Sequence, residues 1–179
     1  IAVKQTRDIN GFGEYLRDAV NKGRQIHILP PYRGDMKIKL AKWFNTDIDN
    51  LSKYVSQELI TEVVKLREIK SDVEVEDMEK AANTAYFMHT TAMKMCKPGV
   101  IEQEIAGAVE GIAISNGYGV SFPVILSVDG QTLHNHNHNN VLQEGRMVVC
   151  DAGAETKNYY ASDFTRTIPV GGKFNSRQS

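Results

Sequence analysis

The feature that most constrains the fold is a long stretch of strong helix formers in the middle of the chain. Residues Glu74 to Met95 are rich in Ala, Met, Glu and Lys and contain neither glycine nor proline. This composition favours an α-helix over the whole stretch. Lys97-Pro98-Gly99 ends it, and Ile101 to Asn116 then repeats the helical spacing of apolar residues, with Gly117 just past the end. The sequence therefore predicts two consecutive helices.

Three runs of β-forming residues follow these helices. Phe122 to Val128 is closed by Asp129-Gly130, which is a strong turn signal. Arg146 to Ala154 and Tyr159 to Pro169 flank a polar turn at Glu155 to Asn158. We predict that the last two runs form a β-hairpin.

The first third of the chain has a weaker α/β pattern. Apolar residues at helical spacing predict a helix over Phe12 to Asn21, and the alternation in Gln25 to Leu29 predicts a short strand. Helix followed by strand indicates an α/β (α+β) fold class. We place a domain boundary before the next helical pattern, so that residues 1–56 and 57–179 form two domains.

Composition excludes several classes of protein. The chain has 179 residues and a formal net charge of −1, which does not favour binding to nucleic acid or to an anionic membrane surface. No run of apolar residues is long enough for a transmembrane helix. Cys96 and Cys150 lie far apart, so we expect no disulfide framework and a cytoplasmic location. Cys150 is predicted to be a buried, inert thiol.

Two aspartates stand where apolar residues would be expected. Asp151 directly follows the apolar run Met147 to Cys150, and Asp163 lies on the second arm of the predicted hairpin. A partly buried carboxylate is costly unless a cation or a donor compensates it, and the hairpin brings the two ends together. Paired carboxylates suit a divalent metal. The simpler alternative is that both are turn or helix-capping aspartates, paired with a cation such as Arg166.

A short run of alternating histidines and asparagines precedes the hairpin. On a strand, His134, His136 and His138 would share one face and could bind a metal. The run is too polar for a buried strand, so we favour a surface loop with one functional histidine. His27 and His89 lie within strand and helix patterns and are predicted to be structural.

Several short segments form a joint pattern over about residues 57 to 175. They are Leu66–Ser71, Lys97–Gly99, Phe122-Pro123, Leu133-His134, Glu144–Glu155, Tyr160–Thr167 and Pro169–Phe174. Together these segments resemble the pita-bread metallopeptidases. The branch that they resemble most is Xaa-Pro aminopeptidase (aminopeptidase P), with prolidase next.

The resemblance implies a fold and a set of site residues. The C-terminal part would be the first half of a pita-bread domain, preceded by the end of an α/β N-terminal domain. Asp151 and Asp163 would bind two divalent metal ions, usually Mn²⁺, with Zn²⁺ or Co²⁺ as alternatives. His134 would steady the substrate or the tetrahedral intermediate, or His136 would do so if the loop register is shifted. Thr165 and Arg166 would orient the carboxylates.

The resemblance also implies an activity for the parent protein. It would be a hydrolase that uses a metal-activated hydroxide to release an N-terminal residue preceding proline, and it would act as a homo-oligomer. The family's remaining ligands, one histidine and two glutamates, have no counterpart here, so we expect the chain to be a fragment that is inactive alone. The alternatives are a prolidase, a creatinase-like or methionine-releasing enzyme, and a pita-bread module that binds peptides or proteins without catalysis.

Overall fold

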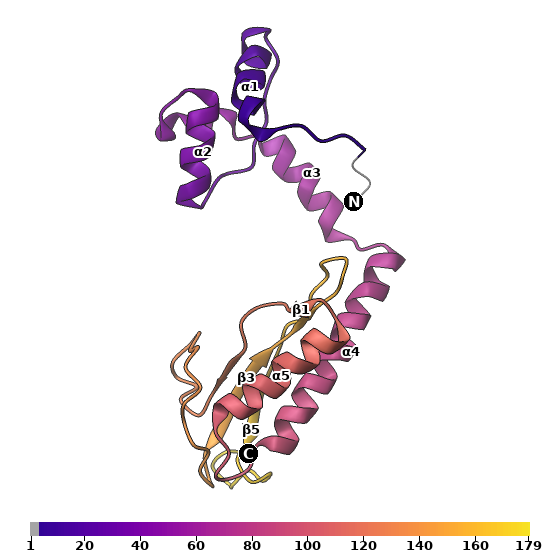
Figure 1. Ribbon diagram of the computed structural model, residues 1–179, viewed down its shortest axis with the longest axis vertical. Helices are drawn as coiled ribbons and strands as arrows, with labels where there is room; N and C mark the ends of the chain where they lie inside the picture. The colour runs from indigo at the N-terminus through magenta and orange to yellow at the C-terminus, as the bar shows by residue number, and fades with distance from the viewer. Residues whose placement is uncertain (1–3) are drawn as a thin grey trace. The chain divides into compact units, whose positions relative to one another are not determined.

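The computed structural model of the chain describes residues 4–179 (Figure 1). The chain divides into two compact units, the first ending at Ile69 and the second spanning Lys70–Ser179. Helix α3, Gln57–Glu68, belongs to the first unit, whereas the sequence analysis assigns it to the second domain. The domain boundary between residues 56 and 57 follows the family pattern and stays a prediction.

The first unit is a small helical cluster. Its elements are the 3₁₀ turn η1 (Ile9–Gly11), helices α1 (Phe12–Asn21) and α2 (Gly34–Phe44), the 3₁₀ segment η2 (Ile48–Tyr54) and helix α3. Helix α1 has the predicted bounds. The buried residues of this unit's core are Leu16, Phe44 and Leu51. Helix α3 begins where the Ser56 hydroxyl accepts a hydrogen bond from the Leu59 N–H, as expected of an N-terminal cap.

The strand predicted over Gln25 to Leu29 is wrong. Only Ile28 makes a β-bridge, with Val55, and the segment is otherwise irregular. A strand requires a neighbour along its length to satisfy its backbone groups. In the described residues the neighbouring segment offers such a partner only around Val55, because it continues directly into helix α3.

The second unit begins with the two predicted helices, α4 (Asp72–Met95) and α5 (Glu102–Asn116). The Glu74 carboxylate accepts hydrogen bonds from both the backbone N–H and the hydroxyl of Ser71, which defines the start of α4. Both helical predictions are confirmed. Within residues 4–179, no helix combines the length and the apolar character needed to cross a membrane.

Five short strands follow, and the hairpin is confirmed. They are β1 (Gly119–Val120), β2 (Ile125–Ser127), β3 (Met147–Ala152), β4 (Ala154–Glu155) and β5 (Phe164–Pro169). Strands β2, β3 and β5 form an antiparallel sheet in that order, and β1 pairs with β4. The second arm of the hairpin begins at Phe164, later than predicted. Thr156 to Tyr160 form the turn, and Ala161 makes only an isolated bridge, with Glu155.

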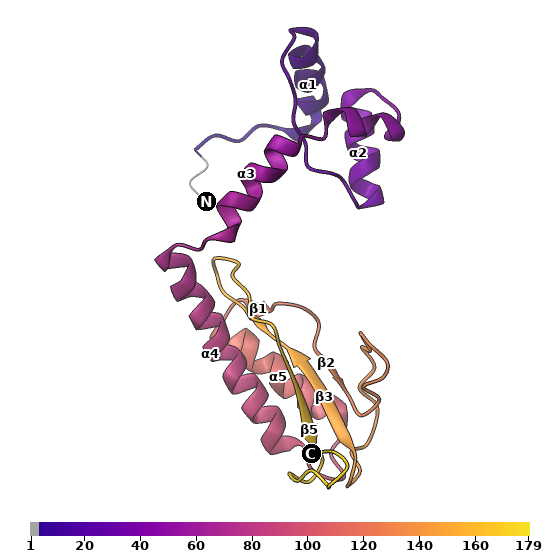
Figure 2. The ribbon, with the colours of Figure 1, turned by 180° about the vertical axis from the view of Figure 1, so that it is seen from behind.

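The two faces of the three-stranded sheet differ in character. Helices α4 and α5 lie side by side on one face (Figures 1 and 2). Val148, Cys150 and Ala152 of β3 are buried in the core shared with these helices. Because neighbouring residues of a strand point to opposite faces, Asp151 lies on the face turned away from the helices.

Candidate metal centre

Asp151 occupies a central position in the sheet. Its Cα partners are Ile125 on β2 and Thr165 on β5, so strands flank it on both sides. The side chain is half-buried, and its Oδ1 atom is buried without a hydrogen-bond partner among residues 4–179. Such an atom in a native protein calls for an explanation, and an ion that binds there is one.

Asp163 lies directly before β5 and shares a cavity with Asp151. The cavity has a volume of about 480 Å³ and is lined by Phe122, Pro123, Ile125, His134, His136, Asp151 and Asp163. The prediction that the hairpin brings both carboxylates to one pocket is therefore confirmed. Phe122 and Pro123, which lead into β2, form the apolar part of the lining together with Ile125 of that strand.

The histidine run forms an irregular loop, which we call the histidine loop (residues 129–140). The Asn135 and Asn137 side chains each accept a hydrogen bond from the backbone N–H two residues ahead, as Asx turns do. His138 is tied to the sheet, with its Nδ1 atom 3.0 Å from the Leu126 carbonyl oxygen. The alternative of three imidazoles on one face of a strand is wrong, because Asx turns replace the strand pairing.

His134 and His136 are both exposed and both line the cavity. The backbone of His134 has a φ of 55°, in the left-handed region where His is enriched among non-glycine residues. The assignment of the functional role to His134, with His136 as the alternative, stays a prediction.

The residues at this cavity fit a divalent metal, to which they would supply some of the ligands. Asp151 supplies a buried carboxylate oxygen that lacks a donor, and Asp163 supplies a second carboxylate on the same cavity. Hard divalent cations prefer such oxygen ligands. Among residues 4–179, however, no group of three or more His, Cys, Asp or Glu side chains is arranged to hold a metal. The described residues thus contribute two carboxylates and no complete centre.

The two residues expected to orient the carboxylates lie on different faces of β5. Thr165 is the Cα partner of Asp151 and shares its face. Arg166 is instead the partner of Cys150, and its guanidinium lies 5.6 Å from the centre of the Phe164 ring. Strand alternation places Arg166 on the helix side, where it lines another cavity with His89. The structure therefore brings Thr165, and not Arg166, to the face of Asp151.

The comparison with protein families matches residues 76–179 to metallopeptidase family M24. This match covers more than half of the chain. The chain belongs to metallopeptidase family M24.

Among curated M24 relatives is a protein named probable Xaa-Pro aminopeptidase from Chaetomium globosum, to which the chain is 30% identical over 159 residues. This alignment covers 86% of this chain and 25% of the relative. The chain is 33% identical over 121 residues to Xaa-Pro aminopeptidase from Escherichia coli, over 65% of this chain and 27% of that protein. The chain thus spans about a quarter of the length of these curated relatives.

Solved M24 structures have the same fold. Zinc-substituted aminopeptidase P from Escherichia coli, in complex with product, superposes with a TM-score of 0.77 at 23% identity, over 99% of this chain and 42% of that one. Prolidase from Pyrococcus furiosus gives a TM-score of 0.69 at 24% identity, over 97% of this chain and 48% of that one. The predicted pita-bread fold is confirmed.

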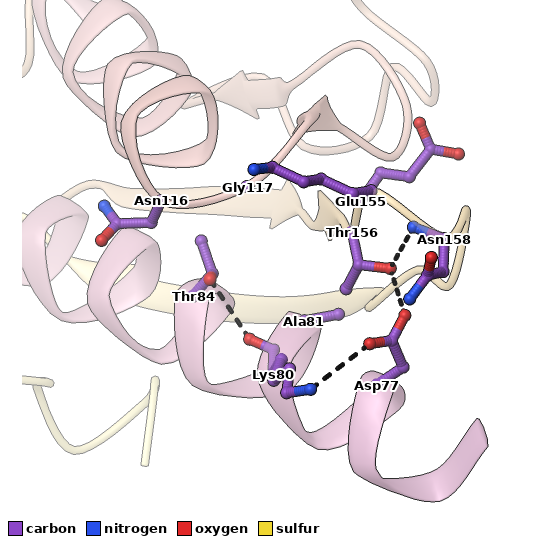
Figure 3. Close-up of a pocket in the computed structure, with 10 residues that line it drawn as sticks. Asp77, Lys80, Ala81, Thr84, Asn116, Gly117, Glu155, Thr156 and Asn158 are labelled. Carbon is purple, nitrogen blue, oxygen red and sulfur yellow. Dashed lines mark hydrogen bonds and ion pairs between the residues drawn. The ribbon is translucent and has the colours of Figure 1, made fainter. Parts of the chain in front are cut away.

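In this M24 chain, the hairpin that carries both carboxylates is tied to helix α4. We call residues 147–169 the aspartate hairpin. Near its tip, the Thr156 hydroxyl donates to Asp77 Oδ2 (2.7 Å) and the Tyr160 hydroxyl donates to Glu74 Oε1 (2.6 Å). Figure 3 shows Asp77, Thr156 and Asn158 pointing toward one another. The Thr156 hydroxyl lowers the pKa of Asp77, and the Tyr160 hydroxyl, with Ser71, lowers the pKa of Glu74 to about 2.

The histidine loop of this M24 chain is held mainly at its ends. Glu102 of α5 is fully buried, and its carboxylate accepts hydrogen bonds from the Val128 N–H (2.7 Å) and the Asn140 amide (3.1 Å). The Arg146 guanidinium pairs with Asp129 at 3.3 Å. Glu102 could not be recognised as an anchor from the sequence, because a glutamate in the first turn of a helix normally indicates only a favourable interaction with the helix dipole.

Cys150 has the environment expected of an inert thiol. The side chain is fully buried on the helix side of β3. Burial, together with the Asp151 carboxylate and Cys96, raises the pKa of the Cys150 thiol to about 12. A thiol that stays protonated is a poor nucleophile, so the prediction is confirmed. His89 is also buried, with Nε2 3.1 Å from the Ala152 carbonyl oxygen, as expected of a structural histidine.

Proposed function

We propose that this chain is part of a metal-dependent aminopeptidase that releases an N-terminal residue preceding proline. The observation that carries the proposal is the unpartnered, buried Oδ1 atom of Asp151 on a cavity shared with Asp163. The names of the relatives support the substrate class, since the curated proteins from Chaetomium globosum and Escherichia coli are both called Xaa-Pro aminopeptidases.

The proposed cofactor is a pair of divalent ions, with Mn²⁺ expected and Zn²⁺ or Co²⁺ as alternatives. Asp151 and Asp163 would supply carboxylate oxygens to hold them. When bound, such ions lower the pKa of a coordinated water and polarise the scissile carbonyl. His134 lies on the same cavity and would donate a hydrogen bond to the oxygen that becomes negatively charged as the peptide is attacked. Thr165, beside Asp151, would steady that carboxylate.

The remaining ligands are proposed to come from outside these 179 residues, because the described part of the chain supplies only two carboxylates to the cavity. The chain alone is then expected to be inactive, and the full-length protein is expected to be a homo-oligomer. A cytoplasmic location is proposed because Cys96 and Cys150 are both free thiols.

The test measures amino-acid release from an Xaa-Pro-Yaa tripeptide and from an Xaa-Pro dipeptide by the full-length protein. We expect cleavage of the tripeptide with Mn²⁺ and its loss with a chelator, whereas a prolidase would prefer the dipeptide. His134→Ala should reduce kcat by roughly 100-fold, as does removal of a hydrogen-bond donor to a developing oxyanion. His136→Ala, which changes the alternative residue on the same cavity, is measured beside it, and a larger loss of kcat in His136→Ala would assign the role to His136. Cleavage that resists the chelator would contradict the proposal, and so would a failure to cleave either peptide with Mn²⁺, Zn²⁺ and Co²⁺ alike.

A further inference from the structure

We infer that Ser162 is a positioning residue that fixes Asp163 relative to Asp151 by tying the aspartate hairpin to helix α4. This inference rests on the proposed function, since it concerns residues that would bind the metal. Ser162 directly precedes Asp163, and it is buried, with 6% of its surface exposed. A serine is mostly exposed in proteins, so its burial here requires hydrogen-bond partners.

The Ser162 hydroxyl joins helix α4 to the hairpin. It donates to the Ala81 carbonyl oxygen of α4 at 3.0 Å. It also accepts a hydrogen bond from the Ala154 N–H of β4 at 3.0 Å. One hydroxyl thus connects the helix with the arm of the hairpin that follows Asp151.

The backbone of Ser162 is held equally firmly. Its N–H donates to the Ala154 carbonyl oxygen at 2.9 Å. Its carbonyl oxygen accepts a hydrogen bond from the Ser121 hydroxyl at 2.7 Å. Ser121 itself bonds through its N–H to the Gly153 carbonyl oxygen at 3.0 Å. The residue before Asp163 is therefore fixed by three separate segments of the chain.

The two arms of the hairpin approach most closely at this point. A Cβ atom placed on Gly153 would lie 1.8 Å from the Ser162 carbonyl oxygen and 2.5 Å from the Ser121 hydroxyl. Only glycine allows this approach. Gly153 is two residues after Asp151, and Ser162 is one residue before Asp163. The contact between Gly153 and Ser162 therefore sets the separation of the two carboxylates.

The other hydrogen bonds between the hairpin and α4 involve residues further from Asp163 along the chain. On the first arm, His89 Nε2 lies 3.1 Å from the carbonyl oxygen of Ala152, next to Asp151. The bond from Thr156 to Asp77 (Figure 3) and that from Tyr160 to Glu74 hold the turn. Of Thr156, Tyr160 and Ser162, only Ser162 is next in sequence to one of the two aspartates. Groups that hold metal ligands in place contribute roughly 10- to 100-fold to metal affinity.

The test compares Mn²⁺ affinity of the full-length protein with that of Ser162→Ala, by isothermal titration calorimetry. Thr84→Ala is the matched control, because the buried Thr84 hydroxyl also donates to a backbone carbonyl of α4, that of Lys80 at 3.2 Å. We expect Ser162→Ala to bind Mn²⁺ roughly 10- to 100-fold more weakly. Thr84→Ala should bind Mn²⁺ as the wild type does.

Equal Mn²⁺ affinity of Ser162→Ala and the wild type would overturn this inference and leave the proposed function standing. Absence of Mn²⁺ binding by the wild type would overturn the proposed function, and this inference with it. If Ser162→Ala does not fold, as judged by circular dichroism, Ser121→Ala decides instead. That variant removes only the hydrogen bond to the Ser162 carbonyl, so weaker Mn²⁺ binding supports the inference and unchanged binding overturns it.

Discussion

The aspartate hairpin and the histidine loop both reach the candidate metal centre, but the protein holds them differently. The hairpin is bonded to helix α4 through Ser162 beside the carboxylate and through Thr156 and Tyr160 near its tip. The histidine loop is anchored at its ends by Glu102 and Arg146, and its central histidines are exposed.

This difference is consistent with the roles proposed for the two segments. Metal ligands must be held close to their bound geometry, so buried contacts along the hairpin suit Asp151 and Asp163. A residue that contacts the substrate during the reaction can lie on an exposed loop, provided that a rigid scaffold positions the loop. The comparison leads to three predictions, given from the largest expected effect to the smallest.

Asp163→Asn in the full-length protein tests the hairpin side of the comparison. Removing the charge of a metal ligand should weaken Mn²⁺ binding by more than the roughly 100-fold seen when only a supporting group is lost. Metal binding is measured by titration calorimetry, and peptide cleavage should fall in parallel. Asp129→Asn is the control, since its carboxylate pairs with Arg146 outside the cavity. Undiminished Mn²⁺ affinity of Asp163→Asn would show that Asp163 is no ligand.

Glu102→Ala tests the anchor of the histidine loop. Without the buried carboxylate, the Val128 N–H and the Asn140 amide lose their partner, and each unsatisfied buried group costs about 1–3 kcal/mol. We therefore expect the free energy of unfolding, measured in urea, to fall by roughly 2–4 kcal/mol.

The control for this change is Glu110→Ala, because Glu110 is an exposed residue of the same helix. Its effect on the free energy of unfolding should stay within about 0.5 kcal/mol. An equally small effect of Glu102→Ala would mean that the loop does not depend on this anchor.

Glu74→Gln tests the contact at the tip of the hairpin and should have the smallest effect. The hydroxyl of Tyr160, with Ser71, lowers the pKa of Glu74 from its usual 4.5 to about 2. The ionised carboxylate therefore contributes to stability fully above pH 4.5, and the contribution is lost as the pH falls toward 2. The stability difference between wild type and variant should shrink over that range in urea unfolding, whereas a constant difference would contradict the assignment.

Much of the fold follows from local sequence signals. Helices α1, α4 and α5 were predictable because their apolar spacing, composition and ends all agree. The location of Asp151 and Asp163 at one cavity was predictable as well, because two apolar runs that flank a polar turn are typical of a hairpin.

Tertiary contacts decided the rest. The segment Gln25 to Leu29 has a strand pattern, but in the described part of the chain it meets only a single bridge partner, Val55, so it stays irregular. Arg166 follows Thr165 in sequence, yet it lies on the other face, because the register with β3 determines which residue faces Asp151.

The sequence by itself determined the helices α1, α4 and α5, the hairpin that follows them, the resemblance to the pita-bread metallopeptidases and the two carboxylates. Only the tertiary structure identified Glu102 and Ser162 as anchors and left Asp151 Oδ1 buried without a partner. The physical reason is that propensity and periodicity act between neighbours in sequence. Burial and hydrogen bonding of a polar side chain depend instead on groups far away along the chain, such as Ala81 for Ser162.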